Sequence, residues 1–391
     1  MFERSTSGGD GEEMTARKRQ VNRIRGSVLA VSWLVVCASA RAQWTAIRLH
    51  GPGDYLSRCL SVGNQQQGGW RQAGPSSPHQ PVIWSGSSGS EVNLALTPSD
   101  VGEINAQWQG LQGGIFNGHA SLWQGTSASR VDLDPGIANT HGTWIQAMRG
   151  TQQAGYIIAP STASHAAMWN GTAASFVDLN PAGANYSYAY ATDGTQQGGI
   201  ADFTIAGQFY QHAALWSGSA ASFVDLNPLP LSGSVVTGMV PGQQAGWYHY
   251  GPNGGRHAAL WSGTAASMID LHPFPGFGSS QLLATDGAIQ VGDSHVPGGG
   301  SFVHAGIWFG TAASFVDLHS FLPAGYSSSS ATSVFQVGGV IYVGGVASNP
   351  LAGTSEAFMW INVPAPSTSA LVFAGMLLRR RPGRRPHRTP E

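Results

Sequence analysis

Two polar residue types recur at fixed distances from a tryptophan, and both could do chemistry. A histidine stands four residues before the tryptophan in five places, and an aspartate follows each of these tryptophans. The histidines are His119, His165, His212, His257 and His304, and the aspartates are Asp132, Asp178, Asp225, Asp270 and Asp317. Imidazole and carboxylate groups ligate metals and transfer protons, so the set invites a metal-site or acid–base interpretation.

Aromatic residues gather in two segments that could bind a ligand. Phe209 and Tyr210 lie within residues 203–211, and Trp247, Tyr248 and Tyr250 lie within residues 246–256. We expect both segments to be loops, in which exposed rings could stack on sugars. The alternative is that these rings cap the ends of the strands against water.

Signals for other chemistry are weak. Candidate carboxylates such as Asp202 and Asp293 are scattered, without the pairing that glycoside hydrolysis needs. The sequence contains no nucleophile motif, phosphate-binding loop, HExxH motif or calcium-loop pattern. No partner pattern surrounds Cys59, which favours a small buried side chain over a nucleophile. We therefore expect no catalytic residue, no metal and no cofactor.

The elements that carry these residues are sequence repeats. Seven tryptophans recur at spacings of 39, 46, 47, 45, 47 and 52 residues. They are Trp84, Trp123, Trp169, Trp216, Trp261, Trp308 and Trp360. Upstream of each tryptophan stands a second signature of glutamine followed by small residues, such as residues 196–199. A period of this length is typical of a propeller blade, and one large buried ring per blade would fill the space between neighbouring sheets.

Residues 186–226 show how one unit is built. Strands are predicted over 186–192, 196–201, 212–216 and 222–226, with a tight turn at Asp193-Gly194. Four short strands make one blade. The sequence thus predicts an all-β fold, a seven-bladed β-propeller with four strands per blade.

The last unit lacks its outer strand. Trp360 is followed directly by the C-terminal segment, whereas residues 46–51 look like a stray copy of the missing strand. We expect this N-terminal strand to complete the last blade, which removes an exposed sheet edge. In such a ring the repeated histidines and aspartates lie in different blades and cannot meet at one ion. Each His–Asp pair is instead predicted to hydrogen-bond within its own blade, beside the buried tryptophan.

The repeat core, His-Ala-x-Leu-Trp followed by Asp-Leu, resembles the HAF family of extracellular repeats. The match covers most of residues 46–360. The resemblance implies an exported protein built from repeats, and it implies no particular reaction.

Composition agrees with an all-β body and argues against nucleic-acid binding. The chain of 391 residues has 54 Gly, 22 Pro and 13 Trp but only 10% charged residues, which suits short strands and tight turns. Residues 43–363 contain six arginines, no lysine and fifteen acidic residues, a formal net charge of −9. Binding to nucleic acid needs clustered Lys and Arg, so it is not expected.

The first 42 residues read as a secretory signal peptide. Basic residues within 17–25 precede an apolar run over 28–38, and signal peptidase is expected to cleave between Ala42 and Gln43, with cleavage after Ala40 as the alternative. Acidic residues near the start make Met14 a possible true start. A lipoprotein signal at Cys37 is disfavoured, because the preceding Val36 is not small. Cys59 is then the cysteine of the mature chain, which leaves no intramolecular disulfide.

Residues 363–391 read as a second processing signal. Val363, Pro364, Ala365 and Pro366 precede an apolar run over 370–378 and a cluster of arginines. As a helix this run spans about 15 Å, half the hydrocarbon core of a bilayer. The tail resembles PEP-CTERM sorting signals, with Ala365 in place of the central glutamate, which implies processing by an exosortase-like enzyme and transient membrane contact. The alternative is a basic tail without a sorting role.

These observations predict a signal peptide (1–42), a propeller (43–362) and a sorting signal (363–391). The favoured function is an exported, non-catalytic protein of the cell surface or extracellular matrix of a Gram-negative-type bacterium that binds polysaccharide or another exported protein. One alternative is a secreted glycan-cleaving enzyme with its site at the propeller mouth, and another is a purely structural surface protein. A cluster of carboxylates at the mouth would favour the enzyme, and an aromatic patch would favour binding.

Overall fold

The computed structural model describes residues 43–63, 65–160, 163–228, 232–250, 254–273, 276–295 and 302–363. They belong to one compact unit, Ala40–Glu391. The predicted cleavage residue Ala42, the alternative start Met14 and the sorting-motif residues Pro364, Ala365 and Pro366 lie outside the described residues. No helix in the described ranges is both long and apolar enough to cross a membrane.

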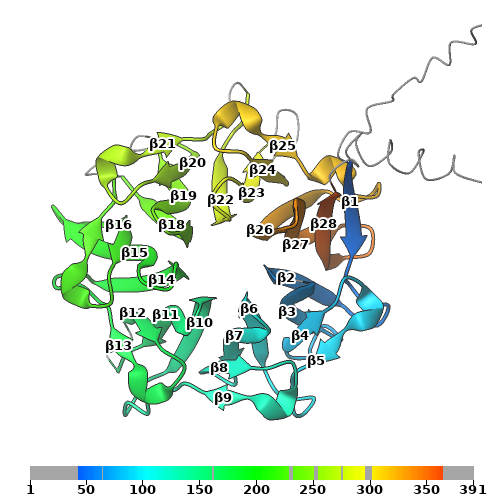
Figure 1. Ribbon diagram of the computed structural model, residues 1–391, viewed down its shortest axis with the longest axis horizontal. Helices are drawn as coiled ribbons and strands as arrows, with labels where there is room; N and C mark the ends of the chain where they lie inside the picture. Colours follow the sequence, from blue (N-terminus) through cyan, green and yellow to red (C-terminus); the bar gives the residue numbers. More distant parts are fainter. Residues whose placement is uncertain are drawn as a thin grey trace, which may run out of the picture. The chain divides into compact units, whose positions relative to one another are not determined.

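The described chain is an all-β propeller. Antiparallel sheets follow one another around a ring, with the first strand of each nearest the centre (Figure 1). Five blades are separate sheets of four strands. They consist of β6 (Gly102–Trp108), β7 (Leu111–Phe116), β8 (His119–Trp123), β9 (Val131–Asp132); β10 (Gly142–Arg149), β11 (Gln152–Ile158), β12 (Ser164–Trp169), β13 (Val177–Asp178); β14 (Tyr186–Thr192), β15 (Gln197–Ile205), β16 (Gln208–Trp216), β17 (Val224–Asp225); β18 (Ser234–Val240), β19 (Gln243–His249), β20 (Arg256–Trp261), β21 (Ile269–Asp270); and β22 (Ser280–Thr285), β23 (Gln290–His295), β24 (Val303–Trp308), β25 (Val316–Asp317).

The remaining eight strands form one further sheet. They are β26 (Ser328–Val337), β27 (Val340–Asn349), β28 (Thr354–Val363), β1 (Gln43–Arg48), β2 (Leu56–Gly63), β3 (Gln66–Gln72), β4 (Gln80–Trp84) and β5 (Val92–Asn93). A single parallel pair, Leu56 with Ser355, joins the strands of the last repeat to those of the first. The prediction of seven separate four-stranded sheets is therefore met for five of them, because this pair merges the other strands into one sheet.

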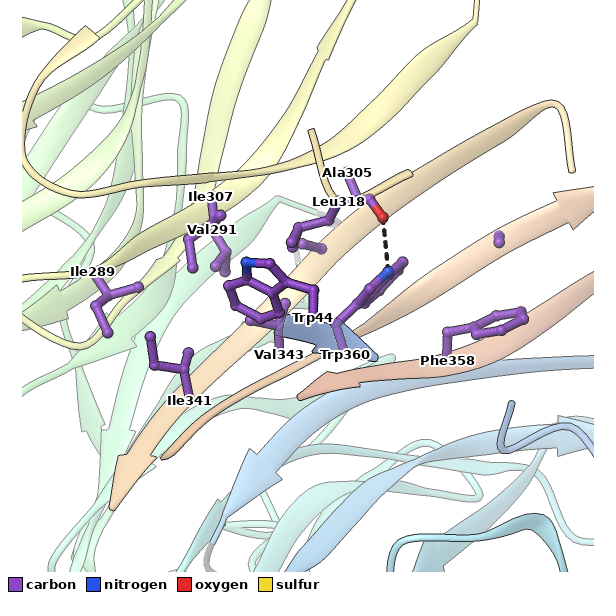
Figure 2. Close-up of a cluster of buried hydrophobic side chains, with 12 residues drawn as sticks. Trp44, Ile289, Val291, Ala305, Ile307, Leu318, Ile341, Val343, Phe358 and Trp360 are labelled. Carbon is purple, nitrogen blue, oxygen red and sulfur yellow. Dashed lines mark hydrogen bonds between the residues drawn. The ribbon is translucent and has the colours of Figure 1, made fainter. Parts of the chain in front are cut away.

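The predicted contribution of the N-terminus is confirmed. Strand β1 pairs antiparallel with β28 along its whole length, from Gln43 with Val363 to Arg48 with Phe358. Figure 2 shows Trp44 of β1 in the same buried cluster as Trp360 and Val343. The Trp360 indole N–H donates to the carbonyl of Leu318 at 2.9 Å, so the closing blade is tied to the preceding one.

The first strand of every repeat contains a β-bulge, and the bulge explains the repeated glycine. In blade β14–β17 the register slips between Ala189 and Ala191, which leaves Tyr190 unpaired. A Cβ on the facing Gly199 would lie 1.9 Å from the carbonyl oxygen of Tyr188, so no larger residue fits. The same collision, at 1.8 to 2.1 Å, would occur at Gly69, Gly114, Gly155, Gly246, Gly292 and Gly345.

The repeated glutamine holds the turn that follows the tryptophan. The side-chain oxygen of Gln197 accepts the backbone N–H of Gly218 at 3.0 Å. Equivalent bonds of 2.8 or 2.9 Å join Gln67 to Gly86, Gln112 to Gly125, Gln153 to Gly171, Gln244 to Gly263 and Gln290 to Gly310. The glutamine predicted upstream of every tryptophan is absent from the last repeat, where the position opposite Trp360 is Val343. This repeat needs no glutamine, because its outer strand comes from β1 and no such turn follows Trp360.

Two predicted element boundaries are wrong. Strands β15 and β16 extend to Ile205 and Gln208 and meet at a tight turn, so residues 203–211 form a hairpin in place of the predicted loop. Its turn is made by Ala206 and Gly207, both with positive φ. The outer strand is also shorter than predicted. A 3₁₀ turn, η4 (Ala220–Ser222), precedes the two-residue outer strand β17. An equivalent turn lies between the tryptophan strand and the outer strand of five other repeats: η1 (Ser88–Ser90), η2 (Ser127–Ser129), η3 (Ala173–Ser175), η5 (Ala265–Ser267) and η6 (Ala312–Ser314). A further 3₁₀ turn is η7 (His319–Phe321).

Candidate ligand-binding site

The repeated histidines and aspartates form one hydrogen-bonded pair in each of the five separate blades. The His Nδ1 to Asp Oδ2 distances are 2.8 or 2.9 Å for His119–Asp132, His165–Asp178, His212–Asp225, His257–Asp270 and His304–Asp317. In the structurally described part of the chain, no group of three His, Cys, Asp or Glu residues could hold a metal ion. The pairs fasten the third strand to the outer strand of the same blade, as the sequence predicted.

In the two remaining repeats, different residues form the hydrogen-bonded pair between the third strand and the outer strand. Gln80 accepts a hydrogen bond from the Asn93 amide at 2.9 Å, and Glu356 accepts one from Arg48 at 2.5 Å. Gln80 and Glu356 stand where the other repeats have histidine, four residues before the tryptophan. Thus a bonded pair links these two strands in each repeat, whatever its charge.

The repeated tryptophans are core residues. Trp84, Trp123, Trp169, Trp216, Trp261, Trp308 and Trp360 are all at most 1% exposed. Cys59 is fully buried, and burial raises the pKa of its thiol to about 12, so the thiolate is absent at neutral pH.

Two of the five aromatic residues predicted to bind a ligand are buried, and their predicted exposure is wrong. Trp247 is 8% exposed and packs against Ile200 and Val235, while Tyr248 is 4% exposed. The Tyr248 hydroxyl donates to Asp270 at 3.0 Å. Both residues lie on β19, which continues to His249, so their rings belong to the faces of a sheet and not to a loop.

The other three aromatic residues reach solvent to different degrees. Phe209 is 73% exposed on β16 and Tyr250 is 63% exposed at the end of β19, whereas Tyr210 is half-buried. The Tyr250 ring stacks on His257 with ring centres 4.8 Å apart and planes 4° from parallel. One ring face of Tyr250 is therefore supported from below, which holds the exposed ring in a defined orientation.

A pocket of about 170 Å³ lies beside the β19–β20 hairpin, at the beginning of β22. Its lining consists of Arg256, Ser279, Ser280, Gln281, Asp293, His295 and Val303. A chain of hydrogen bonds crosses it. Arg256 Nη1 donates to Gln281 Oε1 at 3.2 Å, and Gln281 Nε2 donates to Asp293 Oδ2 at 3.3 Å. The Ser330 hydroxyl also donates to Asp293 Oδ2, at 2.6 Å.

Asp293 is the carboxylate of this pocket and is 6% exposed. Burial raises the pKa of Asp293, and the hydrogen bonds from Ser330 and Gln281 oppose that rise in part. The other carboxylate singled out from the sequence, Asp202, lies in the β14–β17 blade and accepts a hydrogen bond from Asn185 at 2.8 Å. The structure therefore does not bring Asp202 and Asp293 together.

Arg256 joins the aromatic segment to this pocket. Its guanidinium lies 4.3 Å from the centre of the Trp247 ring, while Nη1 reaches Gln281 across the seam between two blades. On the other side of the pocket, the Ser279 hydroxyl is 2.6 Å from His295 Nδ1. The pocket thus combines a guanidinium, an amide, hydroxyl groups, an imidazole and a buried carboxyl group in one lining.

Sequence reasoning missed a second pocket, of about 390 Å³, in the first repeat. It is lined by Arg71, Ala73, Ser77, Gln80, Asn93, Ala95, Leu96, Thr97 and Pro98. Arg71 lies between Asp54 at 3.2 Å and Glu91 at 3.0 Å. Burial and the nearby Asp54 raise the pKa of Glu91 to about 7, against the pull of Arg71. The signal in the sequence was the departure of Gln80 and Asn93 from the His–Asp pattern.

No protein-family model matches the chain, and a search of curated proteins gives no match. Solved structures with a similar arrangement include TolB from Agrobacterium tumefaciens, with 10% identity and a TM-score of 0.45 over 70% of this chain and 94% of that one. A puromycin-hydrolyzing peptidase from Mycobacterium tuberculosis has 12% identity and a TM-score of 0.48 over 80% of this chain. The chain spans only 55% of the peptidase's length. AztD from Citrobacter koseri has 12% identity and a TM-score of 0.38 over 83% of this chain and 100% of that one. Similarity at this level indicates no function for this chain, so a function has to be inferred from its own residues.

Proposed function

We propose that this protein is an exported, non-catalytic propeller that binds extracellular polysaccharide at the pocket between Arg256 and Asp293. The observation that carries the proposal is the polar chain from Arg256 through Gln281 to Asp293 in that pocket. Planar side chains with several donors and acceptors match the hydroxyl groups of a sugar. Phe209 and Tyr250 supply exposed rings on neighbouring blades for stacking along a chain. Another exported protein is the alternative ligand.

The proposal also covers the cellular location of the protein and the number of its blades. We infer a signal peptide removed by signal peptidase before Gln43, HAF-type repeats, and a PEP-CTERM-like tail, beginning at Val363, that an exosortase-like enzyme processes at the cell surface. We count seven blades, treating the eight-stranded sheet as two. Seven bulged first strands and seven buried tryptophans support this count.

The enzyme alternative has less support at this pocket. Cleavage of a glycosidic bond by the common route uses two carboxyl groups about 5 to 9.5 Å apart. Among the described lining residues the pocket has one, Asp293. We therefore keep the non-catalytic function as the proposal.

The test is a glycan-array and polysaccharide pull-down experiment with the full chain. Variants Tyr250→Ala and Arg256→Ala remove an exposed ring and the guanidinium, and each is expected to weaken binding about tenfold. Leu351→Ala is the matched control, because Leu351 is 90% exposed and belongs to neither the pocket nor the aromatic segments. If the unmodified chain binds no glycan, the purely structural function replaces the proposal. Release of shorter sugars from a bound polysaccharide would favour the enzyme.

A further inference from the structure

The centre of the ring contains a chamber that neither the repeats nor the pocket at Asp293 account for. Its volume is about 260 Å³, and its lining consists of one residue from each bulged first strand. These residues are Leu60, Asn105, Gln146, Tyr190, Thr237, Leu283 and Thr332. Each is the extra residue that its bulge leaves out of the ladder. The bulges thus place seven side chains at one level around the axis.

Three of these side chains already donate a hydrogen bond to a backbone carbonyl. Asn105 Nδ2 donates to the carbonyl of Ile145 at 2.9 Å, and Thr237 Oγ1 donates to the carbonyl of Leu282 at 2.7 Å. Thr332 Oγ1 donates to the carbonyl of Cys59 at 2.6 Å. Each accepting carbonyl belongs to the residue just before the bulge of the next blade. For a ligand these three side chains keep acceptor capacity, on an amide oxygen and two hydroxyl oxygens, and Asn105 also keeps the second hydrogen of its amide nitrogen.

Two further side chains remain available to a ligand. The Gln146 amide and the Tyr190 hydroxyl have no hydrogen-bond partner among the described residues, and both are partly exposed to the chamber. Burial raises the pKa of Tyr190, so its hydroxyl stays protonated and can donate. Leu60 and Leu283 add apolar surface. The chamber therefore offers several acceptors, several donors and apolar walls.

The chamber contains no ionised side chain in its lining. Two charged residues, Arg149 and Asp286, line an adjoining hollow of about 210 Å³ that shares the same seven residues. Bringing a carboxylate or a phosphate to the level of the seven residues would cost solvation without a paired charge in return. The chemistry thus favours a neutral ligand that carries several hydroxyl groups.

We propose that the central chamber is a second binding site, which takes one neutral sugar unit of a saccharide chain. The hydroxyl groups of the sugar donate to Asn105, Thr237 and Thr332 and pair with Gln146 and Tyr190. This site is independent of the proposed pocket at Asp293, because the two cavities share no lining residue.

The experiment measures binding of cellotriose, maltotriose, triacetylchitotriose and the charged trigalacturonic acid to the full chain by calorimetry. At least one neutral trisaccharide is expected to bind, at least tenfold more tightly than trigalacturonic acid. Gln146→Ala is expected to weaken that binding about tenfold, since it removes the free amide. Tyr190→Phe, which removes the free hydroxyl alone, is expected to weaken it several-fold. Leu283→Trp is expected to abolish it by filling the chamber.

Controls separate the chamber from the pocket and from loss of folding. Leu351→Trp makes the same substitution at a 90% exposed position and is expected to bind like the unmodified chain. The double variant Arg256→Ala/Tyr250→Ala weakens the other site, so the trisaccharide binding that it retains is assigned to the chamber, and adding Leu283→Trp to it is expected to abolish that binding. Thermal unfolding of Gln146→Ala and Tyr190→Phe checks that both remain folded. The proposal is overturned if no neutral trisaccharide binds, or if Gln146→Ala and Leu283→Trp bind as well as the unmodified chain.

Discussion

At the scale of single residues, the same position is filled by different side chains that keep one hydrogen bond. The backbone N–H of Ala213 donates to the Ser234 hydroxyl at 2.9 Å, across the seam between two blades. The same bond recurs at Ser57, Thr143, Ser187, Ser280 and Ser329. In the remaining seam the donor is replaced by Pro81, which has no N–H, and the hydroxyl residue by Gly102. A Cβ on Gly102 would lie 3.1 Å from the Pro81 ring, so the proline takes the space of the side chain.

Five of these six hydroxyl groups are in turn hydrogen-bonded to an asparagine or a histidine. Ser187 and Ser234 donate to Asn180 at 2.7 Å and Asn227 at 2.6 Å, whereas Ser280 and Ser329 lie 2.8 Å from His272 and His319. These two histidines stack on His257 and His304, with ring centres 4.0 and 3.9 Å apart. Burial, followed by repulsion from the stacked histidine, lowers the pKa of His272 and of His319. Both shifts favour the neutral form of the ring in the folded protein.

This pattern predicts a pH dependence of stability. The folded-state pKa of both histidines lies below the unfolded value of about 6.5. The unfolded chain therefore takes up protons first as pH falls through 6.5, and stability is lost there. The variant His272→Asn/His319→Asn, which copies the choice of residue at Asn180 and Asn227, is expected to lose less stability between pH 7.5 and 5.5. Thermal melts of both proteins across this range check the difference. Glu91 also titrates in this range, with a pKa of about 7, but it contributes equally to both proteins. Parallel losses in the two proteins would contradict the prediction.

At the scale of elements, the bulge decides which sequence a blade can have. It lifts a carbonyl toward the second strand, and in each repeat the residue that fits opposite this carbonyl is a glycine. The bulge also places one side chain in the central chamber. A single irregularity in the first strand thus accounts for both a repeated residue and a variable one.

Substitution at this glycine should damage the blade. In Gly199→Ala the new Cβ would meet the Tyr188 carbonyl at 1.9 Å, which forces the two inner strands apart. We expect a loss of about 3 kcal/mol or more in the free energy of unfolding, measured by urea titration with tryptophan fluorescence. Gly89→Ala is the matched control, because a Cβ there meets no atom within 4 Å. Its expected change is within about 0.5 kcal/mol. Equal stability of the two variants would show that the bulge can relax.

The sequence was informative about elements and poor about exposure. Spacing of the tryptophans and the displaced N-terminal strand follow from repetition, which is visible in one chain. The lengths of β15 and β19 cannot be predicted from repetition, because a strand can extend beyond the repeated core wherever a hairpin turn allows it. Trp247 illustrates the consequence, since its burial depends on Ile200 and Val235 of the facing surface. The chamber residues were invisible for a related reason. Bulge positions vary freely in type, so Gln146 and Tyr190 carry no motif.

At the scale of the whole molecule, one ion pair lies where the first described strand pairs with the last. Arg48 of β1 contacts Glu356 of β28 at 2.5 Å, and the Glu356 side chain is 1% exposed. The Tyr326 hydroxyl and Thr354 also donate to this carboxylate, at 2.5 and 2.7 Å. Burial alone would raise the pKa of Glu356, but the hydrogen bonds from Arg48 and its neighbours lower it to about 2. The pair contributes stability above about pH 4.5 that is lost as pH falls toward 2.

The Arg48–Glu356 pair can be replaced by the Asp and His found at the same positions in five blades. Arg48→Asp places a second carboxylate beside buried Glu356 and is expected to cost about 3 to 5 kcal/mol in unfolding free energy. The double variant Arg48→Asp/Glu356→His restores the His–Asp pair found in five blades and is expected to recover at least half of that loss. Chemical unfolding of the three proteins measures both effects. Failure of the double variant to exceed the single one would mean that Tyr326 and Thr354, more than the pair itself, determine the choice of residues.

The Arg48–Glu356 pair also affects which strands pair with each other when a chain of near-identical repeats folds. An outer strand that strays to the wrong blade would normally meet an acceptable partner, because five blades carry interchangeable His and Asp. Strand β1 is different, since Arg48 would face a histidine in any of those blades, and β28 is different, since Glu356 would face an aspartate. Mispairing at either end therefore brings like charges together or leaves a buried charge alone. Arg48 and Glu356 thus match the first described strand to the last one. This match distinguishes the pair of strands that closes the ring from the near-identical pairs of the His–Asp blades.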